Sequence, residues 1–518
     1  MVSHSPLPVH EDSQQPSVTY NQVSTPSADI DPANEKDKPD GVEISPNIIL
    51  YTSVLVALLQ PLQYGWSTSQ LNLSTFNNKS DCDAHPVPNG KCLIFPGHSK
   101  LEWTFAANAW IVGGMIGSLT SGSVSDILGR KKVLLANCGF IIAGVIVQAS
   151  VSGLWVFAFG RLLSGIASGC ATGVVGGYIN EISPPHLRNA LGVDFQISIT
   201  VGILLVGITF FFADTSSGWR YIAGFPIVLA GLFIVMSPFA MVESPAWLLM
   251  KGRREEAREQ IVRLYGEENV HVAFAWLEPA EKVDVESANP DEELIEEVAL
   301  KESGSTISVL FSKMFLRQML TAIGLCCAQQ LTGINAVFYY SSDIFKKAGI
   351  SDDRVGTLII DIVNVLPTFF SGWLATKYGN RKMMLVGMVI MFISAVCMII
   401  ALVTGIEALS IVFTATYVTG FGISLGPLLW VIVADLFPDS LRASASSICI
   451  CCTWTSNLIV GISYPYIADA LNNYGFVPFV GTLAVFYLFV FKLLPETSGL
   501  TSEEIQAGFR ALRKLNKN

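Results

Sequence analysis

Charged residues are scarce in this sequence. Asp, Glu, Lys and Arg make up only 14% of the 518 residues, while 51% are hydrophobic. Acidic residues outnumber basic ones by 42 to 32, and nothing in this balance indicates a nucleic acid partner. With a mean hydropathy of +0.49, the composition is that of a membrane protein.

Several kinds of functional site are also missing. The sequence contains no constellation of catalytic residues, which argues against an enzyme, and no ring of charges of the kind that lines an ion channel. The glycines at 165, 169, 173 and 177 repeat at helix-packing spacing and do not form a nucleotide loop. Most cysteines lie in apolar segments, where they behave as small hydrophobic residues, so we expect neither a metal site nor a cofactor.

A cleavable signal peptide is absent as well. The first 46 residues are polar, rich in Ser, Pro and Asp, and include no apolar core preceded by positive charge. We expect them to form a disordered cytoplasmic tail. The first apolar span would then act as the insertion signal.

Apolar segments recur along the rest of the chain, each close to the roughly 20 residues that cross a bilayer. They predict an all-α membrane protein with twelve transmembrane helices. The predicted spans are residues 47–70, 101–124, 133–151, 155–180, 188–212, 220–242, 314–345, 353–375, 382–404, 408–434, 441–469 and 475–494.

Lys and Arg in the short loops predict the orientation, because cytoplasmic loops carry more of both. Even-numbered loops hold the basic residues at 130–132, 188, 377–382 and 442, which places both termini in the cytoplasm. Lys346, Lys347 and Arg354, in a predicted outer loop, run against this pattern.

The long first outer loop has two features of an extracellular segment. Cys82 and Cys92 can form a disulfide there. Asn78 begins an Asn-Lys-Ser pattern that is an acceptor for glycosylation. Both features agree with the predicted orientation.

Three motifs of the first half recur in the second at almost one period, which indicates a duplicated chain. EISPPHLRNALG from Glu181 recurs as DLFPDSLRASAS from Asp435, at an offset of about 254 residues. Glu243 of VESP recurs as Glu496 of PETSG, at an offset of about 253 residues. The basic loop after Gly129 recurs after Gly379, at an offset of about 250 residues.

The repeat divides the chain into two six-helix bundles, between which a substrate can be exposed to either side in turn. Between the bundles, REEAREQIVRLY and DEELIEEVALKE predict short helices on the inner face, whereas residues 278–291 fit a solvated linker equally well. The predicted units are a tail at 1–46, a bundle at 47–242, a linker at 243–313, a bundle at 314–494 and a tail at 495–518.

Residues 329–341, QQLTGINAVFYYS, place amides and tyrosines in an apolar span without a charge. Polar side chains at membrane depth face the protein interior or a water-filled cavity, and amides suit a neutral polyhydroxylated ligand because they both donate and accept hydrogen bonds. Gln330 and Asn335 would point about 140° apart on an unbroken helix, so we predict a break at Gly333. The alternative is that these amides only join helices to one another.

Together with GRLLSGIASGCATGVVGGYINEISP, the GRKK and NRK loops, VESP and PETSG, this stretch resembles the sugar porter family of the major facilitator superfamily. The resemblance is greatest to its facilitative glucose transporters and covers residues 46–499. It implies alternating-access transport of a hexose such as glucose, most simply by uniport, in a membrane glycoprotein. A sugar sensor would have the same site but a long signalling tail, whereas about twenty residues follow Gly499 here.

The resemblance also assigns residues that contact the sugar. Matching positions are Gln196, Gln329, Gln330, Asn335, Phe338, Asn364, Phe421, Trp430, Trp454 and Asn457. Gly426-Pro427 matches a flexible break in the tenth span, where a helix is expected to bend.

A second set of matching positions consists of charges that the family uses at its inner face and for gating. They are Arg130, Arg161, Glu181, Arg188, Glu243, Arg381, Asp435, Arg442 and Glu496. We expect Glu181 or Glu243 to pair with basic residues of the other half and so to lock the inner side shut when the protein faces out.

Four departures from the family pattern put some of these assignments in question. Gly422 stands where the tenth span usually has a Glu, and Thr453 stands where an Asn is usual. Two sugar contacts, and with them the identity of the hexose, are therefore in question. Ala246 interrupts the motif at Glu243, and Thr376 replaces an acid, so the inner lock is expected to be looser.

Coupling to protons is the alternative to uniport. In the family's proton symporters an Asp stands in the first span, where this chain has Ser67, which favours uniport. Asp194 and Asp361 are the candidate proton sites, because unpaired carboxylates inside the membrane are costly. The expected partners are a monosaccharide and the bilayer, in the plasma membrane or, alternatively, in a vacuolar or other internal membrane.

Overall fold

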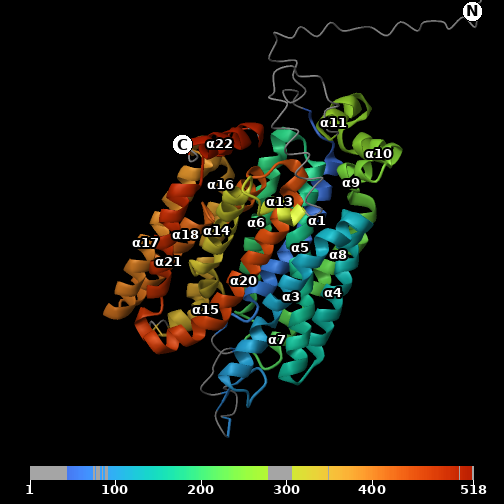
Figure 1. The fold of residues 1–518 in the computed structure, drawn as a ribbon. Helices are drawn as coiled ribbons and strands as arrows, with labels where there is room; N and C mark the ends of the chain where they lie inside the picture. The colour runs from blue at the N-terminus through green and yellow to red at the C-terminus, as the bar shows by residue number, and fades with distance from the viewer. Residues whose placement is uncertain are drawn as a thin grey trace, which may run out of the picture. The chain divides into compact units, whose positions relative to one another are not determined.

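The computed structural model describes residues 44–277 except for several positions between 74 and 91, together with 306–347, 349, 351–500 and 502–515. Within these residues the chain forms helices and no strand (Figure 1). The prediction of an all-α protein is confirmed. The predicted N-terminal tail up to residue 43, Asn78 and the predicted linker helix at 291–302 lie outside the described residues.

The first predicted bundle consists mainly of long helices. Its helices are α1 (Ile48–Ser69), α3 (Lys100–Leu128), α4 (Arg130–Ser150), α5 (Leu154–Ile182), α6 (Pro185–Thr209), α7 (Gly218–Gly224) and α8 (Pro226–Ala240). The long first outer loop separates α1 from α3.

Short helices follow at the predicted inner face, and the second predicted bundle comes after them. The short helices are α9 (Pro245–Met250), α10 (Arg254–Tyr265), α11 (Val270–Leu277) and α13 (Thr306–Leu310). The second bundle contains α14 (Leu316–Leu331), α15 (Ile334–Lys347), α16 (Asp353–Tyr378), α17 (Asn380–Thr404), α18 (Glu407–Gly422), α19 (Leu428–Asp435), α20 (Asp439–Leu471) and α21 (Val477–Leu493), and α22 (Ser502–Leu515) ends the described chain.

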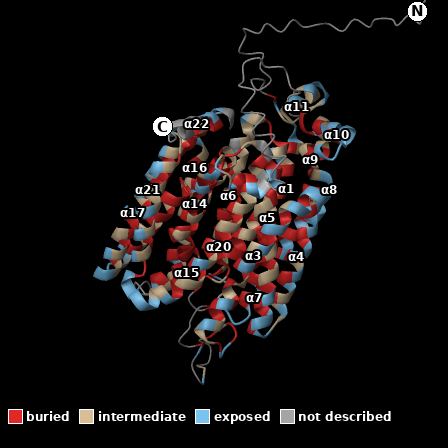
Figure 2. Ribbon diagram, in the orientation of Figure 1, coloured by how far each residue is buried: buried red, intermediate tan, exposed pale blue. Residues whose placement is uncertain are grey.

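In the described residues, ten helical segments are long and apolar enough to cross a membrane. Two shorter apolar helices, at 408–422 and 477–493, coincide with the tenth and twelfth predicted spans. Outward-facing parts of α4, α8 and α17 are exposed (Figure 2), and they carry large apolar side chains such as Phe239, which is 80% exposed. Such a surface suits contact with lipid.

The amphipathic α10 closes one end of the first bundle. Its buried residues recur at helical spacing, namely Ala257, Ile261, Leu264 and Tyr265. The Tyr265 hydroxyl donates a hydrogen bond to the Ile182 carbonyl at the end of α5, 2.7 Å away. In Figure 1, α9, α10, α11 and α22 lie at one end of the helical body and α7 at the other. The predicted helix on the inner face is thus observed for REEAREQIVRLY.

The duplicated motifs have the same physical role in both halves. After Gly129, the Glu243 carboxylate accepts hydrogen bonds from the backbone N–H of Arg130 at 2.9 Å and of Lys131 at 3.1 Å. After Gly379, Glu496 accepts from the backbone N–H of Arg381 at 3.2 Å. A carboxylate therefore caps the N-terminus of α4 in one half and of α17 in the other, where it satisfies free N–H groups and the helix dipole.

Glycines allow α3 and α5 to pack backbone against backbone. A Cβ atom on Gly165 would collide with the Trp110 carbonyl, and one on Gly169 with the Gly114 carbonyl. A Cβ on Gly177, in contrast, would meet nothing within 4 Å. Of the predicted glycine series, the earlier members thus make the close helix contact and the last does not.

We predict that Gly165→Ala lowers the thermal stability of the purified protein and that Gly177→Ala does not. The added methyl group at 165 must push the α3 and α5 backbones apart, and overpacking of this kind costs about 1–3 kcal/mol. Unfolding in detergent, followed by tryptophan fluorescence, measures the difference. Equal midpoints for the two variants would contradict the packing described here.

Candidate functional site

The seventh predicted span is broken where the sequence predicts it. Helix α14 ends at Leu331 and α15 begins at Ile334, and Gly333 between them has a φ of +97°. This value lies in the region that favours glycine. A side chain at this position would also collide with the Phe479 ring.

The break brings the predicted amides together. Asn335 Nδ2 donates hydrogen bonds to Gln330 Oε1 and, at 2.9 Å, to Asn457 Oδ1 of α20. The Tyr339 hydroxyl donates to the same Asn457 oxygen, also at 2.9 Å. We call Gln330, Asn335, Tyr339 and Asn457 the amide cluster; all except Tyr339 were predicted as sugar contacts.

Gln329 links this break to a second one in the tenth predicted span. The chain between α18 and α19 is not helical, so the carbonyl groups there lack helical partners. Gln329 Nε2 donates to the carbonyls of Leu425 and Gly426 at 3.0 and 3.2 Å. The Gln330 amide donates in turn to Gln329 Oε1 at 3.0 Å. The predicted bend at Gly426-Pro427 is observed, and one amide satisfies its carbonyls.

Aromatic rings from both halves meet beside the amide cluster. Trp454 of α20 lies against Tyr64 of α1 and Trp110 of α3, with ring centroids 5.5 and 5.2 Å apart. Tyr64 and Trp110 are themselves 5.4 Å apart. The Trp454 ring fits over Gly114 of α3, where any side chain would collide with it. These three rings are referred to below as the aromatic cluster.

The remaining predicted sugar contacts are distributed over neighbouring helices. Phe338 is buried on α15, and Phe421 is buried at the end of α18. Gln196 is half-buried on α6, next to Phe195, whose ring meets Trp430 edge-on at 6.4 Å.

Two of the predicted contacts carry buried polar atoms that have no hydrogen-bond partner among the described residues. They are Asn364 Oδ1 on α16 and Trp454 Nε1. A buried acceptor and a buried donor of this kind are costly unless a ligand or water satisfies them.

Gly422, where glucose facilitators usually have a Glu, lies in a tight place. A Cβ atom there would approach Thr368 Oγ1 to 3.2 Å and the Asn364 carbonyl to 3.5 Å. A side chain at this position would therefore press on the Thr368 hydroxyl, which would have to shift by a few tenths of an ångström. This departure from the family pattern is part of the packing.

From the first half, the sequence predicted only Gln196 as a sugar contact, and the structure adds further residues beside the site. Besides Tyr64 and Trp110, they include Gln63, which donates to Ser67 Oγ at 2.8 Å and accepts from Ser168 Oγ at 3.3 Å. The Trp110 indole donates to Ser168 Oγ at 3.1 Å. The signal was present, because Gln63 is an uncharged amide inside an apolar span, as in residues 329–341.

Hydrogen bonds join the two halves at their predicted outer ends. Asn72, just after α1, donates to Ser341 Oγ of α15 at 2.8 Å. The Ser69 hydroxyl donates to the Phe338 carbonyl at 3.0 Å. Further along, Lys100 of α3 forms an ion pair with Asp469 of α20. The outer side is closed in this structure.

Arg354 contributes to the same closure. Its guanidinium lies 3.6 Å from Asp214 of the first half and 2.9 Å from Asp352. This hydrogen bond holds the pKa of the Asp352 carboxyl below its usual value. Arg354, one of the three basic residues that run against the predicted orientation, is therefore paired with acids.

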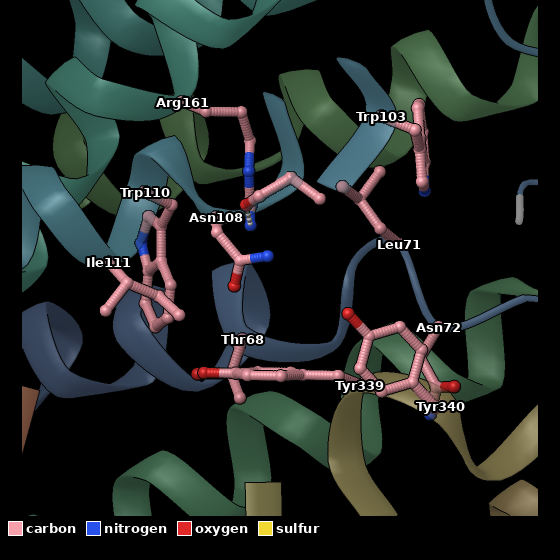
Figure 3. A pocket seen from close by; sticks show the side chains of 11 residues that line it. Thr68, Leu71, Asn72, Trp103, Asn108, Trp110, Ile111, Arg161, Tyr339 and Tyr340 are labelled. Carbon is pink, nitrogen blue, oxygen red and sulfur yellow. Dashed lines mark hydrogen bonds between the residues drawn. The ribbon is translucent and has the colours of Figure 1, made fainter. Parts of the chain in front are cut away.

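A cavity lies between the aromatic cluster and the closed outer ends (Figure 3). Its walls come from α1, α3 and α5 of the first half and from α15 of the second. Polar side chains on these walls are Thr68, Asn72, Asn108, Arg161, Tyr339 and Tyr340.

The placement of Arg161 corrects one prediction. It was grouped with inner-face and gating charges, but it lies two turns from the start of α5, beside the cavity. Its guanidinium donates to the carbonyls of Ser67 at 2.9 Å and Ala107 at 3.1 Å. The predicted span at 155–180 already separates Arg161 from Glu181 by about 20 residues, or roughly 30 Å of helix, so the two could not lie at the same end.

The other matched charges lie toward the inner ends of the helices and contact their own half. Arg130 binds Glu181 through Nη2 at 2.9 Å. Arg188 Nε and Arg442 Nε donate to the carbonyls of Ser183 and Ala434. Asp435 ends α19. The expected pairing of Glu181 or Glu243 with the other half is not observed here, because Arg130 and the N-terminus of α4 already use these carboxylates.

The two candidate proton sites differ in their surroundings. Asp194 is half-buried in the third turn of α6. Asp361 is fully buried on α16, and its Oδ2 has no hydrogen-bond partner. This oxygen lies against Gly207 of α6, so the carboxyl group is at the junction of the two halves.

In the first outer loop, Cys82 and Cys92 are joined by a disulfide. Of the other cysteines, Cys138, Cys170, Cys326 and Cys449 are buried, and the remaining four are half-buried.

The geometry favours recognition of a neutral polar ligand. The amide cluster offers donors and acceptors but no ionisable carboxylate or ammonium group, and aromatic rings adjoin it. It lies where the two halves meet, between a closed outer side and the inner ends.

Comparison with known proteins supports this interpretation. Residues 53–509 match the family described as sugar (and other) transporter. The chain is 32% identical to the mouse facilitated glucose transporter member 4 of solute carrier family 2, over 90% of this chain and 92% of that protein. It is 34% identical to the chicken member 1, over 88% and 92%.

Solved structures show the same fold. The proton:xylose symporter XylE, bound to 6-bromo-6-deoxy-D-glucose, superposes with a TM-score of 0.72 at 22% identity, over 88% of this chain and 98% of that one. The inward-open form of the E. coli xylose transporter XylE superposes with a TM-score of 0.68 at 23% identity, over 88% and 99%. Sequence match and fold agree, and the chain belongs to the sugar (and other) transporter family, as a multi-pass membrane transporter and not an enzyme.

Proposed function

We propose that this protein carries a hexose such as glucose across the membrane by alternating access, as a uniporter. The observation that carries the proposal is the amide cluster, in which residues of α14, α15 and α20 form one hydrogen-bonded group at the junction of the halves. Relatives that are about a third identical are facilitated glucose transporters.

A hexose suits this site physically. Each sugar hydroxyl donates and accepts, and the side-chain amides of Gln330, Asn335 and Asn457 can do the same. The unpaired Trp454 Nε1 and Asn364 Oδ1 are a further donor and acceptor on predicted contact residues. The rings of the aromatic cluster offer flat faces for the C–H groups of a pyranose. We propose the whole predicted set, including Gln196, Phe338, Phe421 and Trp430, as the surroundings of the sugar.

The closed outer side has to open during transport by alternating access. The contacts of Asn72 and Lys100 with the second half must break to admit a sugar from outside. In that state the inner ends would come together, and Glu181 and Glu243 would then be near the other half. The predicted inner lock thus belongs to the outward-facing state, and the predicted units at 47–242 and 314–494 are proposed as the moving bodies.

Uniport is favoured by the surroundings of Ser67. In the family's proton symporters this position is an Asp, and here its backbone carbonyl accepts from Arg161 while its hydroxyl accepts from Gln63. The side chain at this position is therefore a hydroxyl that accepts from Gln63, where a symporter has a group that can take up a proton.

Proton-coupled symport is the second candidate, and the observation in its favour is Asp361. Its carboxyl group is buried against α6 without a hydrogen-bond partner on Oδ2, so a change in its charge would alter the contact between the halves. Asp194 is the other proposed site. For location we propose the plasma membrane, with glycosylation at Asn78.

We predict that Gln330→Ala and Asn335→Ala each reduce the initial rate of D-glucose uptake into liposomes at least about tenfold. Each change removes a hydrogen-bonding group from the site and leaves buried partners unpaired, which costs about 1–3 kcal/mol. Gln148→Ala is the matched control, because Gln148 is a buried amide that joins α4 to α5 away from this site. Normal uptake by both site variants, in folded protein, would remove the amide cluster as the sugar site.

We also predict that labelled D-glucose equilibrates across the liposome membrane and does not accumulate when a proton gradient is imposed. Ser67→Asp, which places a carboxyl group beside Arg161, should make uptake depend on the external pH, whereas Ser67→Asn should not. Uphill accumulation by the wild type that a protonophore abolishes would establish symport instead. In that case Asp361→Asn should remove accumulation.

A further inference from the structure

Arg161 is a buried charge without an acidic partner. Its side chain is almost fully enclosed, since the residue is only 4% exposed. Within the described part of the chain, no carboxylate forms an ion pair with it. Its protein partners are the carbonyls of Ser67 and Ala107 and the ring of Trp110, whose centroid is 5.5 Å from the guanidinium carbon.

These partners leave part of the guanidinium unused. A guanidinium has five N–H donors in one plane. The two carbonyls engage Nη1 and Nη2, whereas Nε has no hydrogen-bond partner in the part of the chain that the structure describes. An arginine does not lose its proton inside a protein. The remaining charge and donors must therefore be satisfied by something other than the described side chains.

The cavity is the place where such a partner can bind. It is lined by Arg161 together with Asn108, Thr68 and Tyr339, and Figure 3 shows the guanidinium pointing toward the side chain of Asn108. The enclosed space beside these groups is small, about 30 Å³ for the centres of water-sized spheres, which is room for a small ion or a single carboxylate group. The Asn108 amide and the Thr68 and Tyr339 hydroxyls already donate to protein acceptors. The donors left for a bound group are therefore the unused N–H groups of Arg161, and a guanidinium suits an anion.

We propose that this cavity binds a small monovalent anion, either a free ion such as chloride or acetate or the carboxylate of a sugar acid. Arginine forks bind carboxylates in two-point contacts and are weakly hydrated, so they favour such ligands when buried. The ion would provide the counter-charge that Arg161 lacks in the described residues.

The position of the cavity gives the anion a consequence for closure of the outer side. Three of its helices belong to the first half and α15 to the second, and Asn72 on its wall donates to Ser341 across the junction. An anion held there would stabilise the outer-closed state. This consequence rests on the proposed transport function, whereas anion binding itself does not.

The test uses the purified full-length protein in detergent and follows thermal unfolding by tryptophan fluorescence. The buffers contain chloride, acetate or D-glucuronate at equal ionic strength, with the bulky 2-(N-morpholino)ethanesulfonate anion as reference. We expect at least one of the three anions to raise the unfolding midpoint by a few degrees in a saturable manner. Chloride or acetate would identify a free ion, and D-glucuronate alone a sugar-borne carboxylate.

Variants assign the effect to the cavity. Asn108→Asp supplies an internal carboxylate beside Arg161 and should abolish the response, as should Arg161→Gln. Arg220→Gln is the matched control, because Arg220 also contacts a carbonyl, at 2.7 Å, and a tryptophan ring, at 4.4 Å, but lies outside the cavity. It should keep the full response.

Two results would overturn the proposal. One is the same thermal unfolding midpoint in all four salts. The other is a folded Asn108→Asp variant whose unfolding midpoint rises with the anion as much as that of the wild type. Glucose uptake by the same preparations is measured separately. A protein that responds to anions but takes up no sugar would contradict the transport proposal and leave this one standing.

Discussion

The structure depends on the requirement that backbone polar groups inside a membrane find partners within the protein. Two predicted spans are interrupted, at Gly333 and between residues 422 and 428, and each interruption frees carbonyl and N–H groups. Gln329 lies close to the first interruption. Its amide donates to the carbonyls of Leu425 and Gly426 in the second one. The same helix turn holds Gln330 in the amide cluster. Polar groups needed to stabilise the broken helices thus stand next to those proposed to bind the sugar.

Much of the fold followed from the sequence because its signals are local. The lengths of the apolar segments predicted the spans, and Gly333 predicted a break because only glycine adopts its backbone conformation easily. The recurrence of Glu243 and Glu496 predicted a duplicated chain, and the structure supplies a physical reason for it, since each carboxylate caps one helix.

Contacts between distant segments were predicted less well. Tyr64 and Trp110 resemble ordinary aromatic residues of a span, and only the meeting of three helices places them against Trp454. Arg161 was grouped with the inner-end charges by its match to the family, although its distance from Glu181 along α5 places it near the other end of the helix. The partners of Glu181 depend on the conformation, so one sequence is compatible with pairing inside a half or between halves.

The carboxylates that cap α4 and α17 have a consequence for the energy of the transport cycle. Glu181, Glu243 and Glu496 find their partners inside their own half, so separating the inner ends uncovers none of these three as an isolated charge. In each half, these carboxylates are thus paired with groups of the same half. The proposed lock of the outward-facing state would therefore exchange one set of partners for another, and a neutral sugar can shift the balance between two states whose charges are paired in both.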